Sequence, residues 1–201
     1  MARIPADDLL AMYASGIFPM AEGRDGAIML FSPDPRTIMD PAGMIISRSL
    51  KRTIRSGQFE IRLDTCFGQV VRACADRDET WISEDIIKSY EELHARGHAH
   101  SVEVWDDGCL AGGLYGVAIG GAFFGESMFS VRRDASKVAL AALCDRMVRC
   151  GMVLLDVQYS TPHLLGLGAF EVSREEYLRR LDAALRLPVA FRDESEGRPL
   201  G

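Results

Sequence analysis

The segment from Gly97 to Lys137 constrains the fold most, because it has the pattern of short strands separated by turns and followed directly by a helix. Apolar runs at 101–105, 109–119 and 122–130 are separated by Asp106-Asp107-Gly108 and by Gly120-Gly121, residue types that tolerate the backbone of tight hairpin turns. This spacing predicts an antiparallel meander. Seven glycines between Gly108 and Gly125 exceed what the turns need, so they either serve turns alone or also let a ligand or another backbone approach closely.

A helix is predicted over 135–150, where apolar residues recur at helical spacing, Asp134 stands at the N-cap position and Gly151 ends the pattern. An apolar strand at 152–158 follows it. Earlier in the chain, the patterns predict strands at 28–31 and 59–63 and helices at 6–15, 47–56, after Asp64 and after Ser83. A last helix begins at Ser173, where Glu176 forms a capping box with it, and ends near Leu185.

The composition suits one main compact domain of 201 residues, 48% hydrophobic and 26% charged. No apolar run approaches the ~18–20 residues that a membrane span needs, and Asp7 and Asp8 stand where a signal peptide would be apolar. Five cysteines without a C-x-x-C pair argue against a disulfide framework or a thiolate zinc site, so we expect a cytoplasmic protein. The net charge of −6 argues against a general nucleic-acid coat but allows a local basic patch.

The predicted helix 47–56 is such a patch, since it carries four cations and no acid. A solvated face is the ordinary explanation of charged residues on a helix, but such faces usually mix both signs. Uncompensated cations in an acidic protein suggest contact with a phosphate backbone instead. The candidate phosphate-binding residues are therefore Arg48, Lys51, Arg52 and Arg55.

Familiar catalytic motifs fit poorly. His94, His98 and His100 have a spacing that zinc could use, but Gly97 should end their helix and no acid is placed to assist, so we expect no metal site. The stretch Gly125–Phe129 (GESMF) resembles a nucleophile elbow only superficially, because its last residue is not glycine. A serine hydrolase is therefore disfavoured.

Asp156 and Gln158 end an apolar strand, and strand alternation puts both side chains on one face. A buried acid is costly unless it is paired, so Asp156 either satisfies turn amides structurally or has a functional role. Glu126 is a second acid, within the glycine-rich meander. With apolar residues of the neighbouring helix, these groups could bind an amine beside an apolar side chain, although the same helix residues would equally form a plain core stripe.

With these residues in place, the chain resembles the leucyl/phenylalanyl-tRNA–protein transferases. The likeness runs in the family's order over residues about 9 to 180, which is far more specific than one motif. The matching stretches are Tyr13–Pro19, Ser32–Arg36, Ser47–Arg52, Phe67–Val71, Thr80–Ile82, Leu93–Trp105, Gly112–Gly116, Gly125–Ser130, Ala135–Lys137, Asp156–Gln158 and Leu167–Ala169.

The resemblance implies an α/β fold with a GNAT-like mixed, largely antiparallel sheet flanked by helices. We expect a small N-terminal segment at 1–36, the aminoacyltransferase domain at 37–190 and a disordered tail at 191–201. The implied reaction moves Leu or Phe, and also Met, from aminoacyl-tRNA to the N-terminal Arg or Lys of a protein, which marks that protein for degradation. No metal or organic cofactor is implied, and we expect a monomer.

By the same resemblance, Asp156 orients Gln158, whose amide lies near the attacking amine, and Glu126 helps to hold the basic peptide end. The candidate substrate-binding residues are Trp81, Leu114, Phe123, Met128, Leu140, Leu143 and Met147, and the cations of helix 47–56 become candidate tRNA contacts. Met20 stands where many members have Trp, which removes a flat ring for stacking a base. An acetyl-CoA-dependent GNAT acetyltransferase is the second hypothesis, and a module that only binds tRNA is a third.

Overall fold

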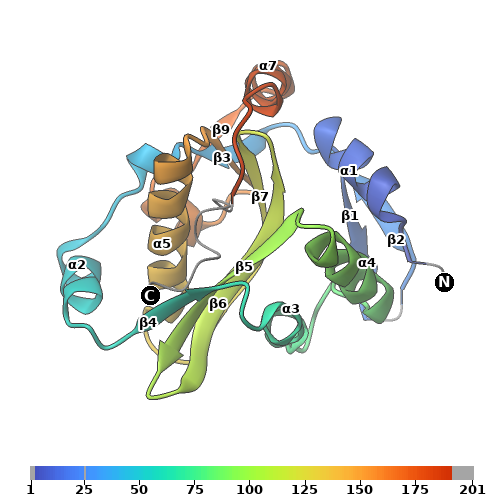
Figure 1. The fold of residues 1–201 in the computed structure, drawn as a ribbon. Coiled ribbons are helices and arrows are strands. Elements are labelled where there is room, and N and C mark those ends of the chain that lie inside the picture. Colours follow the sequence, from blue (N-terminus) through green and yellow to red (C-terminus); the bar gives the residue numbers. More distant parts are fainter. Residues whose placement is uncertain (1–2, 25, 192–201) are drawn as a thin grey trace, which may run out of the picture.

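The computed structural model describes residues 3–24 and 26–191, and its centre is a seven-stranded sheet (Figure 1). The strand order is β4-β5-β6-β7-β8-β3-β9, in which β7 and β8 are parallel and the other neighbours antiparallel. The strands are β3 (Arg36–Met39), β4 (Glu60–Leu63), β5 (Ala99–Asp106), β6 (Cys109–Ile119), β7 (Ala122–Ser130), β8 (Leu154–Gln158) and β9 (Phe170–Val172). The expected mixed, largely antiparallel sheet flanked by helices is confirmed.

The meander predicted from the glycine-rich segment is β5, β6 and β7, which pair in sequence order. Both explanations of the glycines hold. Gly120 has φ +53° in the turn between β6 and β7, whereas a Cβ on Gly116 would lie 2.2 Å from the Phe124 carbonyl oxygen. Gly116 therefore lets the bulged β6 and β7 backbones approach each other closely.

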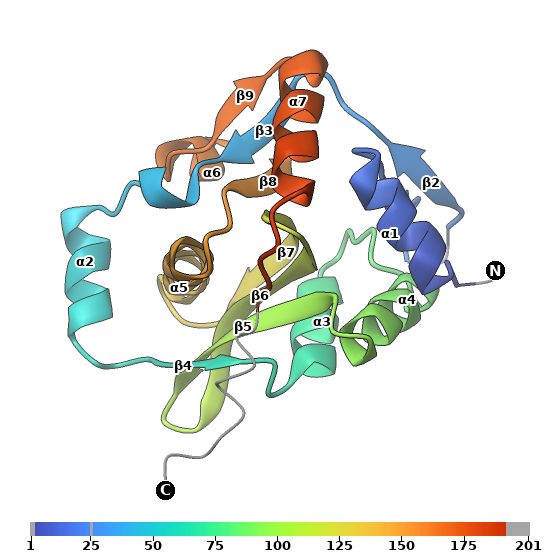
Figure 2. The same cartoon turned by 45° about the horizontal axis from the view of Figure 1, so that its top comes forward.

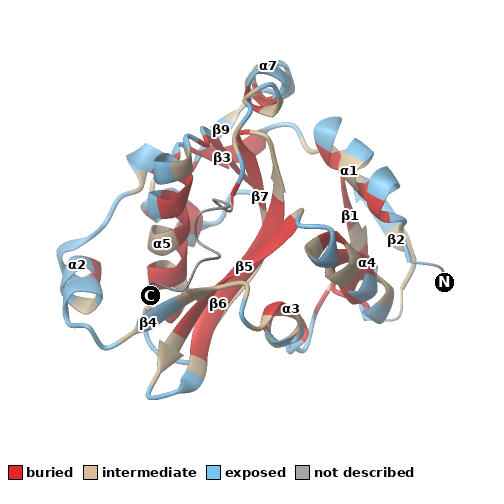
Figure 3. Cartoon of the chain, in the orientation of Figure 1, coloured by how far each residue is buried: buried red, intermediate tan, exposed pale blue. Residues whose placement is uncertain are grey.

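Helices cover both faces of the sheet (Figures 1 and 2). One face packs on α5 (Ala135–Cys150), which contacts β5, β6 and β7 and carries α2 (Arg48–Arg55) on its outer side. The opposite face packs on α3 (Phe67–Ala75) and α4 (Glu84–Ala95). The large domain also contains the 3-10 helix η1 (Pro41–Gly43), α6 (Pro162–Gly166) and α7 (Arg174–Leu185). Figure 3 shows the central strands of the sheet largely buried between these layers, whereas the edge strands β4 and β9 are partly exposed.

The N-terminal elements are α1 (Ala6–Ala14) and the antiparallel hairpin of β1 (Phe18–Ala21) and β2 (Ile28–Phe31). They share one hydrophobic cluster with α3, α4 and the sheet, to which Tyr13 and Phe18 contribute fully buried rings. Arg36 opens β3 and so belongs to the large sheet. Within the described part of the chain, no helix has both the length and the apolar character needed to cross a membrane.

Three of the predicted helix N-caps are confirmed. Ser47, Ser83 and Ser173 each accept a hydrogen bond from a backbone N–H three residues ahead. The cap at Asp64 is wrong, because Cys66 precedes α3 and Asp64 accepts hydrogen bonds from Ser101 N and His100 Nδ1 on β5 instead. Asp134 stands at the predicted N-cap of α5, but its side chain pairs with Lys137 Nζ, 2.8 Å away, rather than with a backbone amide.

The predicted disordered tail is wrong for its first residue. Phe191 is buried, with its ring centroid 5.2 Å from that of Phe123 and 4.6 Å from that of His100. Its carbonyl oxygen also accepts a hydrogen bond from Arg146 Nε. The rest of that tail, 192–201, lies outside the described residues.

Candidate active site

The site lies where two neighbouring strands separate. β7 pairs with β8 only from Ala122 to Phe124, and beyond this point the strands leave space between them. The residues that follow the last pair, Glu126 to Met128 on β7 and Val157 and Gln158 on β8, line two adjoining cavities. The divergence of two parallel strands therefore creates the opening.

The first cavity is an apolar pocket of about 100 Å³. It contains four of the predicted substrate-binding residues, namely Leu114, Met128, Leu140 and Leu143, and Glu126 and Gln158 stand at its polar end. Phe123 and Met147 are instead fully buried in the hydrophobic cluster around α5. A dry cavity of about 150 Å³ holds a benzene molecule, so this pocket suits one aliphatic side chain and needs to widen for a phenyl ring.

The second cavity is an open cleft of about 250 Å³ that shares Glu126, Met128 and Gln158 with the pocket. Its walls carry Trp81, the remaining predicted substrate-binding residue, and Met20 of the N-terminal hairpin. The pocket and the cleft thus meet at one carboxylate and one amide. A substrate with an apolar end and a larger polar body would fill both.

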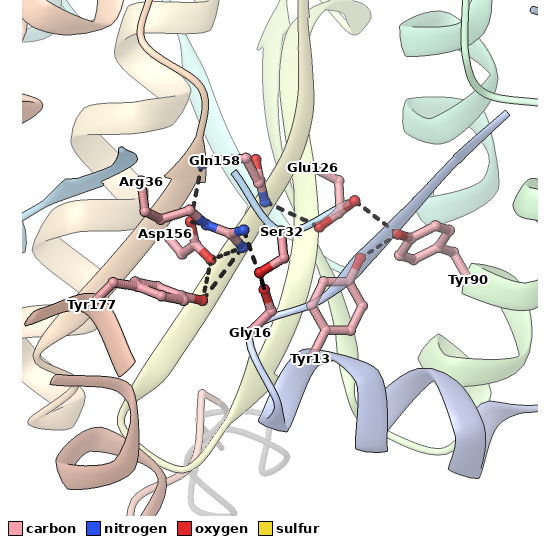
Figure 4. A network of polar contacts seen from close by, with 9 residues as sticks. All are labelled: Tyr13, Gly16, Ser32, Arg36, Tyr90, Glu126, Asp156, Gln158 and Tyr177. Atoms are coloured by element: carbon pink, nitrogen blue, oxygen red, sulfur yellow. Dashed lines mark hydrogen bonds and ion pairs between the residues drawn. The ribbon is translucent and has the colours of Figure 1, made fainter. Parts of the chain in front are cut away.

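Beneath the junction, Asp156 is fully buried and has several donors around it (Figure 4). Arg36 donates from Nε at 2.9 Å and from Nη2 at 2.6 Å, and the Tyr177 hydroxyl donates at 2.7 Å. The Arg36 guanidinium lies between the rings of Phe18 and Tyr177, 4.6 Å from each centroid. The buried acid therefore has a paired, well-hydrogen-bonded cation, as burial of charge requires.

Gln158 is hydrogen-bonded through both its backbone and its side chain. Its backbone N–H donates to Asp156 Oδ1 at 3.0 Å, with φ at +60°, a left-handed conformation that is uncommon for residues other than glycine. Its side-chain Nε2 lies 3.4 Å from Glu126 Oε1, and Figure 4 shows the amide oxygen on the side away from Glu126. Asp156 thus positions Gln158 through the backbone, and Glu126 fixes the amide.

Glu126 ends a chain of buried hydroxyl groups. The Tyr90 hydroxyl donates to Glu126 Oε2 at 2.7 Å and is itself hydrogen-bonded to the Tyr13 hydroxyl. Burial of the carboxylate raises the pKa of Glu126 to about 7, and the negative charge of Asp156 adds to the shift. The tyrosine hydrogen bonds and the Arg36 charge oppose it. Such a carboxyl group exchanges its proton near neutral pH.

The predicted tRNA-binding cations lie apart from this junction. Arg48, Lys51, Arg52 and Arg55 are all exposed on α2, where Leu50 is the buried anchor. None of these four side chains forms an ion pair with an acidic residue among residues 3–24 and 26–191. As far as the described residues go, the predicted lack of acidic partners on this face is confirmed.

The sequence reasoning missed the residues that support the two acids. Arg36, Tyr177 and Tyr90 are not among the candidate residues that the sequence indicates. The available signal was the buried acid itself, because Asp156 at the end of an apolar strand needs a cation. Nothing local indicated which arginine would supply it.

Among the described residues, no three His, Cys, Asp or Glu side chains form a group that could hold a metal ion. His94 is stacked on Phe67, with ring centroids 4.2 Å apart, and its Nδ1 is hydrogen-bonded to the Ala99 carbonyl oxygen. His100 pairs with Asp64. These histidines hold the β4–α3 region against β5.

Comparisons with known proteins agree over nearly the whole chain. The family model for leucyl/phenylalanyl-tRNA protein transferase matches residues 38–182, and the model for its N-terminal domain matches residues 2–34. A protein of that name from Rubrobacter xylanophilus is 53% identical over 94% of this chain and 99% of its own length. One from Herpetosiphon aurantiacus is 52% identical over 94% of this chain and 98% of its own length.

Among solved structures, a GCN5-related N-acetyltransferase from Kribbella flavida is similar to this chain with a TM-score of 0.46. It is 10% identical, over 82% of this chain and 60% of the other. The family models and the relatives cover both the N-terminal hairpin and the large sheet. This chain belongs to the leucyl/phenylalanyl-tRNA protein transferase family.

Proposed function

We propose that the protein transfers leucine, phenylalanine or methionine from aminoacyl-tRNA to the N-terminal Arg or Lys of a protein, creating a degradation signal. The observation that carries the proposal is the junction of an apolar pocket with an open cleft at Glu126 and Gln158. The donor side chain enters the pocket, and the terminal nucleoside lies in the cleft beside Trp81. The ester bond between them then falls at the junction.

The reaction is aminolysis of an ester. The acceptor amine attacks the ester carbonyl carbon, the new amide bond forms, and the ribose oxygen leaves with its electron pair. Holding the amine and the ester together supplies much of the rate, since proximity alone can lower such barriers by about 7–11 kcal/mol. The amine must also lose a proton, and the ribose oxygen must gain one.

Glu126 is suited to that proton transfer. As a carboxylate it attracts the cationic peptide end, and a pKa of about 7 lets it accept a proton from the amine and return it to the leaving oxygen. The Gln158 amide oxygen, on the side away from Glu126, accepts a hydrogen bond from the amine and orients it. Asp156 acts as a positioning residue, because it reaches the amine only through the Gln158 backbone.

The exposed cations of α2 contribute a second contact with the donor, by binding phosphates of the tRNA body. Five free cysteines fit a reducing compartment, so we place the protein in the cytoplasm. We also propose that it acts as a monomer.

Transfer can be tested directly with purified protein, leucyl-tRNA or phenylalanyl-tRNA labelled in the amino acid, and a peptide beginning with Arg. Label should enter this peptide and not one of the same sequence with an acetylated N-terminus. Acetylation of the peptide from acetyl-CoA would favour the acetyltransferase hypothesis. A shift in tRNA mobility without any transfer would leave only a binding module.

A further inference from the structure

Arg77 stands at the wall of the cleft, in the loop between α3 and α4, and is tied to β7. Its Nη2 donates to the Met128 carbonyl oxygen at 2.5 Å and to Ser127 Oγ at 3.0 Å. The Arg24 guanidinium holds the Arg77 backbone in turn, by donating to its carbonyl oxygen at 3.2 Å. The Arg77 side chain is therefore fixed beside Met128, which lines both the pocket and the cleft.

The guanidinium is nevertheless available to a ligand. Arg77 is exposed, and it has no carboxylate partner in the part of the chain that the structure describes. Its Nε and Nη1 carry further N–H donors. Among the described residues that line the cleft, Arg77 is the sole cation, while the other walls are apolar, aromatic or polar, apart from Glu126.

The proposed function says what such a cation would meet. With the donor side chain in the apolar pocket and the ester at Glu126 and Gln158, the terminal nucleoside must extend into the adjoining cleft. Its one charged group is the phosphate on the 5′ oxygen, which joins it to the preceding nucleotide. Arginine is favoured for binding phosphate, and its guanidinium stays charged at any working pH.

We propose that Arg77 binds this terminal phosphodiester and makes the enzyme prefer donors that carry it. The inference rests on the proposed function and adds a specificity-determining contact to it. The same side chain joins the nucleotide to the acyl pocket, because it holds the β7 edge at Met128. Placing the phosphate thus also places the ester.

Two minimal donors test the contact. One is the 3′-leucyl ester of adenosine, and the other is the 3′-leucyl ester of adenosine 5′-monophosphate, which differs only by the phosphate. The measured quantity is the ratio of their kcat/KM values with an Arg-initiated peptide. We expect the wild type to prefer the phosphorylated donor by about tenfold, as a hydrogen bond to a charged group allows.

In Arg77→Gln the ratio should fall close to one, while Arg77→Lys, which keeps the charge, should retain most of it. Lost contacts to Ser127 and Met128 would slow both donors alike, so they cancel in the ratio. Arg96→Gln is the matched control. Arg96 is also an exposed arginine, but it lies just beyond the C-terminal end of α4 and does not line the cleft. It should keep the wild-type ratio.

An unchanged ratio in Arg77→Gln overturns the phosphate contact, even if both rates fall, and leaves Arg77 as a strand anchor only. That failure is distinct from failure of the proposed function. In the latter case the wild-type protein would transfer leucine neither from these donors nor from leucyl-tRNA.

Discussion

Replacing Asp156 by asparagine tests how far its carboxylate serves the fold as well as the reaction. Asp156 is fully buried and accepts hydrogen bonds from Arg36, Tyr177 and the Gln158 backbone. Asparagine keeps the shape but removes the charge and one acceptor, so it leaves the buried Arg36 cation uncompensated. Breaking a buried ion pair from one side costs about 3–5 kcal/mol.

In a chain of this length 1 kcal/mol shifts Tm by about 2–4 °C, so Asp156→Asn should lower Tm by roughly 6–20 °C. A purely functional role for Asp156 would leave the stability of the variant normal, whereas these contacts predict a destabilised variant. Removing the partner as well should relieve part of the loss. We expect Arg36→Met with Asp156→Asn to be more stable than the sum of the single effects, by about 0.5–3 kcal/mol.

The assay is urea and thermal unfolding of the wild type, both single variants and the double variant, followed by kcat measured where each is folded. Asp182→Asn is the matched control, because Asp182 pairs with Arg186 at 2.8 Å on the surface, with both side chains more than half exposed. That change should cost no more than about 1 kcal/mol. A Tm for Asp156→Asn close to that of the control, or free energies that simply add in the double variant, would refute this reasoning.

Three further predictions concern protons, phosphates and the acyl group. The pKa of Glu126 is about 7 in the folded protein, against an ordinary 4.5. Between these two pH values the folded state holds a proton on Glu126 that the unfolded state has lost, so stability falls as pH rises from about 4.5 to about 7. Glu126→Gln should abolish this pH dependence of stability, and also the rise of kcat/KM that deprotonation of Glu126 produces near pH 7. If kcat/KM of the variant depends on pH as it does in the wild type, Glu126 is excluded as the base. Alanine at all four cations of α2 should flatten the salt dependence of tRNA binding by up to about 0.7–0.9 per lost contact, and an unchanged slope contradicts the contact. Leucyl-tRNA should exceed isoleucyl-tRNA in kcat/KM, incompletely, because hydrophobic fit gives about 1–3 kcal/mol, and Met128→Ala should raise the Phe-to-Leu ratio by widening the pocket. Equal values for the Leu and Ile donors would contradict a shape-selective pocket.

The sequence predicted best what depends on near neighbours. The meander follows from alternation and from turn residues such as Asp107 and Gly108, and three serine caps depend on an N–H three residues away. Asp64 shows the limit. It has the right side chain for a cap, but β5 lies close enough for Ser101 and His100 to donate to it instead. Local propensity gives way to a contact across 36 or 37 residues.

The candidate site divides in the same way. Asp156, Gln158 and Glu126 could be named because acids and amides stand out in apolar or glycine-rich strands. Their partners could not, since Arg36 and Asp156 are 120 residues apart and Tyr90 and Glu126 are 36 apart. The substrate-binding residues were predicted only in part, since Phe123 and Met147 lie in the core and not in a cavity. Spacing on α5 cannot tell Leu143, which faces the cavity, from Met147, which faces the core.

The pairing of Arg36 with Asp156 also bears on how the chain is made. A ribosome adding about 5–20 residues per second needs roughly 6–24 s to synthesise the 120 residues between them. During that time the growing chain carries Arg36 without its carboxylate partner and Phe18 without the ring of Tyr159. The packing of the N-terminal hairpin is therefore complete only after β8 has emerged. Catalytic competence is thus among the last properties acquired during translation. A chain that stalls before Asp156 presents the apolar hairpin to chaperones and proteases rather than an active enzyme to its substrates.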